Sequence, residues 1–176
     1  MINISRRRAL KHFVYVSAGM ILVPSCMQDS TKSSFLLKKI KVSPNDEFML
    51  AELCETIIPK TDTPGAKDLS AHLFVLMMVD DCSTKEEQDL FVSGMQAFSE
   101  LTKKITGKSF LDANTTERRK TIEAVVSINE KDSPIAAFYS EVKKRTIQAY
   151  TGSEYFLTQV QVYELIPGRY HGCVSA

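Results

Sequence analysis

The sequence predicts an all-α protein: a small bundle of about five helices with an irregular C-terminal tail, preceded by a signal peptide. Three observations predict this class. Apolar residues recur at helical spacing in five segments, residues that begin or end helices stand between those segments, and no segment shows convincing strand alternation. The chain has 176 residues, 44% of them hydrophobic and 24% charged, which suits one domain with a real core. A formal net charge of +1 without an aromatic-interleaved basic surface argues against nucleic acid as a partner.

Residues 1–26 are predicted to be a signal peptide and are excluded from the fold. The basic stretch Ser5–Lys11 precedes an apolar run shorter than the roughly 20 residues that a membrane-spanning helix needs. Arg6 and Arg7 stand in the order Ser-Arg-Arg-x-x-Leu-Lys, which is typical of a twin-arginine export signal, with Ala9 where an aromatic residue is more usual. The alternative is an ordinary signal peptide that contains three arginines by chance.

A lipid anchor is predicted at the end of this leader. Val23-Pro24-Ser25-Cys26 is similar to a bacterial lipobox, in which the cysteine becomes the lipidated N-terminus, although Pro24 is atypical. The alternative is a normal cleavage site after Ser25. Residues 27–43 are polar and predict a tether between the leader and a helical domain at 44–176. We therefore expect an exported, periplasmic protein that is attached to the membrane through its leader or its lipid.

The first two helices are predicted at about 44–58 and 68–80. Ser43 is suited to the N-cap of the first helix, Pro44 fits its first position, and Pro59 stops it. The second segment is apolar nearly all round, which predicts the central buried helix of the bundle.

Three further helices and a tail complete the predicted domain. Thr84 and Glu87 form a capping-box pattern at the start of the third helix, and Gly107 ends it. The fourth helix is expected from Thr115 or Thr116 to about Asn129, and the fifth from Ser133-Pro134 to Gly152. Residues 153–176 hold no clean period and predict an extended tail with aromatic side chains. Such a tail binds a partner or folds back as a lid over the bundle.

The sequence predicts no reaction centre of its own. It lacks the GxGxxG, GxSxG and HExxH motifs and the spacing for covalent haem or an iron–sulfur cluster. His72 lies in an apolar helix without a metal-ligand partner at helical spacing, so we expect a helix residue whose ring is satisfied. We therefore predict a non-catalytic protein without a bound cofactor.

The cysteines form an odd set if Cys26 is lipidated. Cys54 and Cys82 lie on the first helix and just past the second, so they are a candidate disulfide across an antiparallel pair. Cys173 then remains in the tail, where we expect it to pair with a partner chain or dock against it. The alternative is that Cys54 is a buried free thiol.

Two separated segments resemble the gluconate 2-dehydrogenase subunit 3 family. The first is Leu50–Ala66, which ends a helix with Ile-Ile-Pro and continues into a Thr-Pro-Gly-Ala turn. The second is Ala149–Tyr155 together with Tyr163–Cys173, which is similar to the family's Tyr-x-x-Ser-Glu segment and its Pro-Gly-x-Tyr-x-Gly-Cys close. The resemblance covers about residues 44–174, and a twin-arginine leader is also common in this family.

The resemblance implies a non-catalytic small subunit of a periplasmic sugar or alcohol dehydrogenase. Its partner would be a large FAD-dependent subunit of the glucose–methanol–choline type, which lacks an export signal and travels folded with the small subunit. A cytochrome c subunit carrying haem c would receive the electrons. The tail residues have the composition of interface anchors, so we expect them to bind the partner: Tyr155, Tyr163, Arg169, Tyr170 and Cys173. The alternatives are a stand-alone helical periplasmic lipoprotein that binds something else, and an enzyme whose site has no recognisable motif.

Overall fold

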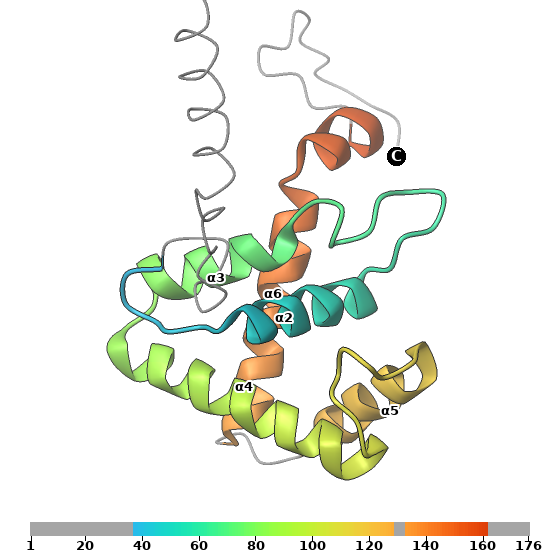
Figure 1. Cartoon of the computed structure of the whole chain (residues 1–176). Coiled ribbons are helices and arrows are strands. Elements are labelled where there is room, and N and C mark those ends of the chain that lie inside the picture. Colours follow the sequence, from blue (N-terminus) through green and yellow to red (C-terminus); the bar gives the residue numbers. More distant parts are fainter. Residues whose placement is uncertain (1–36, 129–132, 162–176) are drawn as a thin grey trace, which may run out of the picture. The chain divides into compact units, whose positions relative to one another are not determined.

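The computed structural model describes residues 37–128 and 133–161. Within those ranges the chain forms five α-helices and one short π-helix, and it contains no strand (Figure 1). The elements are α2 (Pro44–Ile57), α3 (Ala71–Cys82), α4 (Lys85–Thr106), α5 (Thr115–Val126), α6 (Pro134–Thr151) and η1 (Phe156–Val160). The predicted all-α class is confirmed.

Capping residues explain most helix boundaries. Ser43 and Thr84 each accept a hydrogen bond from a backbone N–H of the first turn, in capping boxes with Asp46 and Glu87. Gly107 ends α4 with a φ of 72°, a conformation that glycine adopts without a steric penalty. The predicted start of α5 at Thr115 is confirmed, and its N-cap is Asn114, whose side chain accepts a hydrogen bond from Glu117 N.

The second helix begins later than predicted. Residues 65–70 form a turn in which Ala71 N donates to Ala66 O over 2.9 Å, and Ser70 adopts a left-handed φ of 52°. This turn replaces the expected first helical residues, so α3 starts at Ala71. The prediction that this helix is the central one is also wrong, since α6 packs against α2, α3, α4 and α5.

The core is centred on the crossing of α4 and α6. The Phe138 ring lies 5.0 Å from the ring of Phe91 and 5.7 Å from that of Phe98, measured between centroids, and Phe98 lies 5.1 Å from Phe110. These are favourable separations for tilted aromatic pairs. Gly94 lets the helices approach closely, because an added Cβ would lie 2.5 Å from Phe138 Cβ and closer still to the Pro134 carbonyl oxygen.

The first part of the predicted extended tail is folded. Ser153 Oγ donates to Tyr150 O over 2.7 Å and accepts from Phe156 N over 3.2 Å, which turns the chain from α6 into η1. The extended conformation is therefore wrong for residues 156–160, because a serine hydroxyl can satisfy backbone groups just beyond a helix end. The rest of the tail, 162–176, lies outside the described residues.

Candidate interaction surface

The loop between α2 and α3, residues 58–70, is held by a carboxylate of the helix that precedes it. Glu55 accepts hydrogen bonds from Lys60 N (2.8 Å) and Lys67 N (3.0 Å), and both of its oxygens are used. Gly65 lies against this carboxylate, and an added Cβ would collide with both oxygens and with Lys60 N. The Thr-Pro-Gly-Ala turn therefore contains glycine because the Glu55 side chain occupies the space where another residue would place its Cβ.

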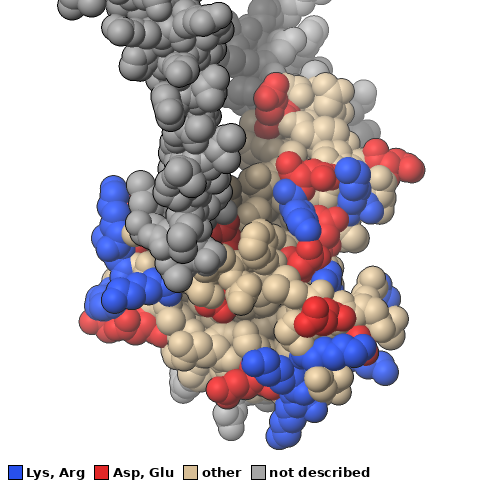
Figure 2. Space-filling view, in the orientation of Figure 1, with Lys and Arg blue, Asp and Glu red and all other residues tan. Residues whose placement is uncertain are grey.

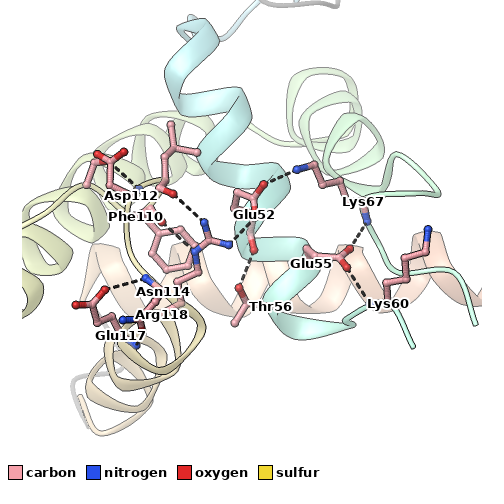
Figure 3. Close-up of polar contacts among 12 residues, drawn as sticks. Glu52, Glu55, Thr56, Lys60, Lys67, Phe110, Asp112, Asn114, Glu117 and Arg118 are labelled. Atoms are coloured by element: carbon pink, nitrogen blue, oxygen red, sulfur yellow. Dashed lines mark hydrogen bonds and ion pairs between the residues drawn. The ribbon is translucent and has the colours of Figure 1, made fainter. Parts of the chain in front are cut away.

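Arg118 on α5 ties the same helix to the segment that precedes α5 (Figure 3). Its Nη1 lies 2.6 Å from Glu52 Oε2, while Nε donates to Phe110 O over 3.0 Å and Nη2 donates to Leu111 O over 2.9 Å. The guanidinium also lies 5.4 Å from the centre of the Phe110 ring, within cation–π range. One arginine thus fixes three parts of the chain through its planar fork.

Glu52 is the acceptor at the centre of this corner. It pairs with Arg118 and also with Lys67, which extends from the loop after α2. Burial raises the pKa of Glu52, but the hydrogen bonds and charges of Lys67 and Arg118 outweigh burial, so the pKa lies below its usual value. Glu52 is therefore ionised at neutral pH and serves as a fixed anchor, without the raised pKa that a general acid requires.

A groove of about 520 Å³ opens beside this corner, between the last turn of α2, α5 and α6. We call it the basic groove, because most of its charged side chains are cationic. Its lining is Glu55, Thr56, Ile57, Pro59, Lys60, Thr115, Arg118, Arg119, Ile122, Tyr139 and Lys143. Burial raises the pKa of the Tyr139 phenol, so this residue is a neutral hydroxyl donor at physiological pH.

Aromatic side chains gather at the far end of α6. The Tyr150 ring meets those of Tyr155 and Phe156 edge-on, with centroids 6.5 and 6.1 Å apart, and all three side chains are partly exposed. Tyr155 is thus the one predicted partner-binding residue within the described part of the chain, and it stands in an aromatic cluster. Its role in binding remains a prediction.

The candidate Cys54–Cys82 disulfide is not formed in the structure. Both residues are free thiols, and they lie in different environments: Cys54 is fully buried, whereas Cys82 is exposed at the end of α3. Cys54 Sγ accepts a hydrogen bond from Thr146 Oγ1 on α6 over 3.3 Å, so its side chain faces the core between α2 and α6. The alternative of a buried free thiol is the one that the structure matches.

His72 departs from the expectation of a satisfied ring. Its Nδ1 is buried and has no hydrogen-bond partner in the structure. Burial lowers the pKa of the imidazole, which favours the neutral ring. Among residues 37–128 and 133–161, no group of three or more His, Cys, Asp or Glu side chains is arranged to hold a metal ion, and no helix there is long and apolar enough to cross a membrane.

Several predicted functional residues fall outside the described ranges. They are the export-signal residues Arg6 and Arg7, the lipidation residue Cys26, and the tail residues Tyr163, Arg169, Tyr170 and Cys173. In the other direction, sequence reasoning missed Glu52, Glu55 and Arg118. Glu52 and Arg118 are 66 residues apart, and no local spacing connects two charges at that separation.

The fold and the surface define a small all-α protein with a cation-lined groove. A family model described as Gluconate 2-dehydrogenase subunit 3 matches residues 44–168. The chain therefore belongs to the gluconate 2-dehydrogenase subunit 3 family, as the segments Leu50–Ala66 and Ala149–Tyr155 predicted. No curated protein and no solved structure matched the chain.

Proposed function

We propose that this chain is the non-catalytic small subunit of a periplasmic, FAD-dependent gluconate or sugar dehydrogenase. In this proposal it binds the folded flavoprotein subunit, of the glucose–methanol–choline type, and accompanies it through twin-arginine export. FAD is held by the flavoprotein, and haem c by a cytochrome subunit where one is present. The observation that carries the proposal is the family match over residues 44–168. The matched range includes the segments Leu50–Ala66 and Ala149–Tyr155.

The leader supports the export part of the proposal. Arg6 and Arg7 supply the twin-arginine pair, and a partner that folds around its flavin before export needs a route that accepts folded proteins. Lipidation of Cys26 would give the complex a double lipid anchor at the membrane, where one acyl chain alone binds only marginally.

The helical body supports the binding part. The carboxylate-held loop after α2 and the arginine fork at Arg118 keep one side of the molecule in a fixed shape, and a preformed surface loses little entropy on binding. A stable complex buries on the order of 1,600 Å² in total. The basic groove and the aromatic cluster at Tyr150 are described surfaces that can contribute to such an interface.

The test is a conservative change in the leader, made in the native host. Replacing Arg6 and Arg7 by lysine keeps the charge of the leader and should leave both this chain and the flavoprotein in the cytoplasm. Arg8→Lys is the matched control, because it makes the same chemical change outside the twin-arginine pair. The measurement is flavoprotein abundance and dye-linked gluconate oxidation in periplasmic and membrane fractions.

Each outcome bears on one part of the proposal. Normal periplasmic levels of the flavoprotein in the double variant would overturn the escort role. Export of this chain without any co-purifying flavin-bearing subunit would favour the stand-alone lipoprotein. Cys26→Ser should release the complex from the membrane without stopping export, and continued membrane attachment would exclude the lipid anchor.

A further inference from the structure

The basic groove carries more positive charge than the described part of the chain neutralises. It is lined by four cations, Lys60, Arg118, Arg119 and Lys143, and by one carboxylate, Glu55. The two Glu55 oxygens already accept backbone N–H groups of the neighbouring loop, so that charge is engaged inside the chain.

Two of the four cations have no partner within the described part of the chain. Lys60 pairs with Asp68 over 3.0 Å, and Arg118 pairs with Glu52 over 2.6 Å. Arg119 and Lys143 are exposed and make no ion pair or hydrogen bond with any described residue. They stand on opposite walls, on α5 and α6, so the groove presents unpaired positive charge from two sides.

Apolar side chains also line the groove or stand near it. Ile57, Pro59 and Ile122 line it. One turn further along α5, Val126 is 62% exposed, and one turn beyond Lys143 on α6, Ile147 is 44% exposed. An occupant therefore meets aliphatic surface directly beside the cations, which is a poor environment for a fully hydrated anion and a good one for an amphipathic segment.

The same face of α6 leads from the groove to the aromatic cluster. Tyr139, Lys143, Ile147 and Tyr150 follow at intervals of four, four and three residues, which places them on one side of the helix. Tyr150 in turn contacts Tyr155 and Phe156. The surface is thus continuous between the two segments by which the chain resembles its family.

We propose that the basic groove binds an acidic, amphipathic segment of the flavoprotein subunit, with carboxylates at Arg119 and Lys143 and an apolar side chain against the lining residues Ile57, Pro59 and Ile122. This assignment rests on the proposed function, because the flavoprotein is the partner invoked there. Charge complementarity identifies the occupant: the unpaired cations call for carboxylates, and the aliphatic margins call for a folded protein segment.

The test reverses the unpaired charges and compares them with other lysines of the same chain. Arg119→Glu with Lys143→Glu is the groove variant. Lys103→Glu with Lys104→Glu is the matched control, since these lysines are exposed in the last turn of α4 and make no ion pair with a described residue. Figure 2 shows Lys and Arg side chains spread over several parts of the visible face, so the control also tests a general effect of basic charge.

The full-length tagged chain is purified in mild detergent from the native host, and the flavin absorbance that co-purifies is measured per mole of chain. The groove variant should retain at least about tenfold less flavoprotein than the wild-type chain, whereas the control variant should retain wild-type amounts. Added salt should weaken the wild-type complex, because exposed charges are screened within about 10 Å. This loss should be larger than the part that Lys103 and Lys104 contribute. Circular dichroism confirms that both variants are folded.

The outcomes separate the two proposals. If wild type captures the flavoprotein and both variants retain it, the groove assignment is overturned and the proposed function stands. Equal loss in both variants would also overturn the groove, since the effect would be one of overall charge. If the wild-type chain captures no flavoprotein, both proposals fail. A photo-crosslinker placed at position 119 should join the chain to an acidic peptide of the flavoprotein, and one placed at position 104 should not.

Discussion

The α4–α6 crossing and the corner between α2 and α5 are held together in different ways. At the crossing, three phenylalanine rings and Gly94 pack against one another by complementary shape. At the corner, carboxylates and one arginine hold irregular backbone through directed hydrogen bonds. The crossing therefore sets the stability of the fold, while the corner sets the shape of one surface, the one that contains the basic groove.

The largest effect should come from filling the space at the crossing. Gly94→Val places atoms against the Pro134 carbonyl and Phe138 Cβ, so α4 and α6 must separate, and we expect a loss of about 3 kcal/mol or more in the free energy of unfolding. Ser93→Val is the control, because it makes a similar change at an exposed position of the same helix and should cost roughly 0.5 kcal/mol. Urea unfolding measures both. Equal effects would mean that the crossing is not tightly packed.

A smaller loss should follow from removing the arginine at the corner. Arg118→Met removes the hydrogen bonds to Phe110 O and Leu111 O and the ion pair with Glu52, for which we expect about 2 kcal/mol. Arg119→Met, the adjacent exposed position, should change stability by less than about 0.5 kcal/mol. Arg118→Lys should restore little, since an ammonium cannot reproduce the fork. Full rescue by lysine would show that charge alone matters there.

A third carboxylate shows how such anchors respond to pH. Asp80 is buried and accepts backbone N–H groups of Lys38, Lys39 and Ile40 over 2.7–2.9 Å, which attaches the segment before α2 to the end of α3. Burial raises the pKa of Asp80, but the three donors outweigh it, so the pKa lies below its usual value.

The sign of the pH effect follows from that depressed pKa. The stabilisation by Asp80 is complete above its unfolded pKa of about 3.9 and is lost as pH falls through the lower folded value. Asp80→Asn should therefore be about 1–2 kcal/mol less stable than wild type at pH 5–7, with a difference that shrinks below about pH 4. Unfolding curves at several pH values measure this. A difference that stays constant down to pH 2 would contradict the ionised anchor.

The contrast between crossing and corner also explains what sequence reasoning could predict. Thr84 and Glu87 are three residues apart at the start of α4, and Gly107 acts at its end, so a local pattern predicted each limit of this helix. The start of α3 was predicted too early, because the turn before Ala71 depends on the Glu55 side chain of α2 and on the left-handed backbone of Ser70. The central position of α6 was missed because it depends on Gly94, which makes the crossing possible. A single glycine in a helical pattern does not indicate which helix packs against it.

The groove was missed for the same reason. Its cations come from the loop after α2, from α5 and from α6, and by sequence alone the Lys143–Arg145 run is most simply interpreted as a solvated helix face. That interpretation is right for the helix alone, since Lys143 is exposed. Only the arrangement of three helices brings it opposite Arg119. Long-range placement, not residue type, creates this site.

The smallest perturbation is chemical labelling of the two described cysteines, one of which is buried and the other exposed. Burial raises the pKa of Cys54 to about 11, and its side chain is enclosed beside Thr146, so at pH 8 it is both protonated and inaccessible. Cys82 is exposed at the end of α3. Since the thiolate is the reactive form, a maleimide should modify Cys82 in the native protein and Cys54 only after unfolding, as read by peptide mass mapping. If neither cysteine reacts with the maleimide until a reductant is added, the result would support a Cys54–Cys82 disulfide. Modification of Cys54 at the rate of Cys82 would instead show that the contact between α2 and α6 opens readily, and the core would then be less rigid than the corner that it supports.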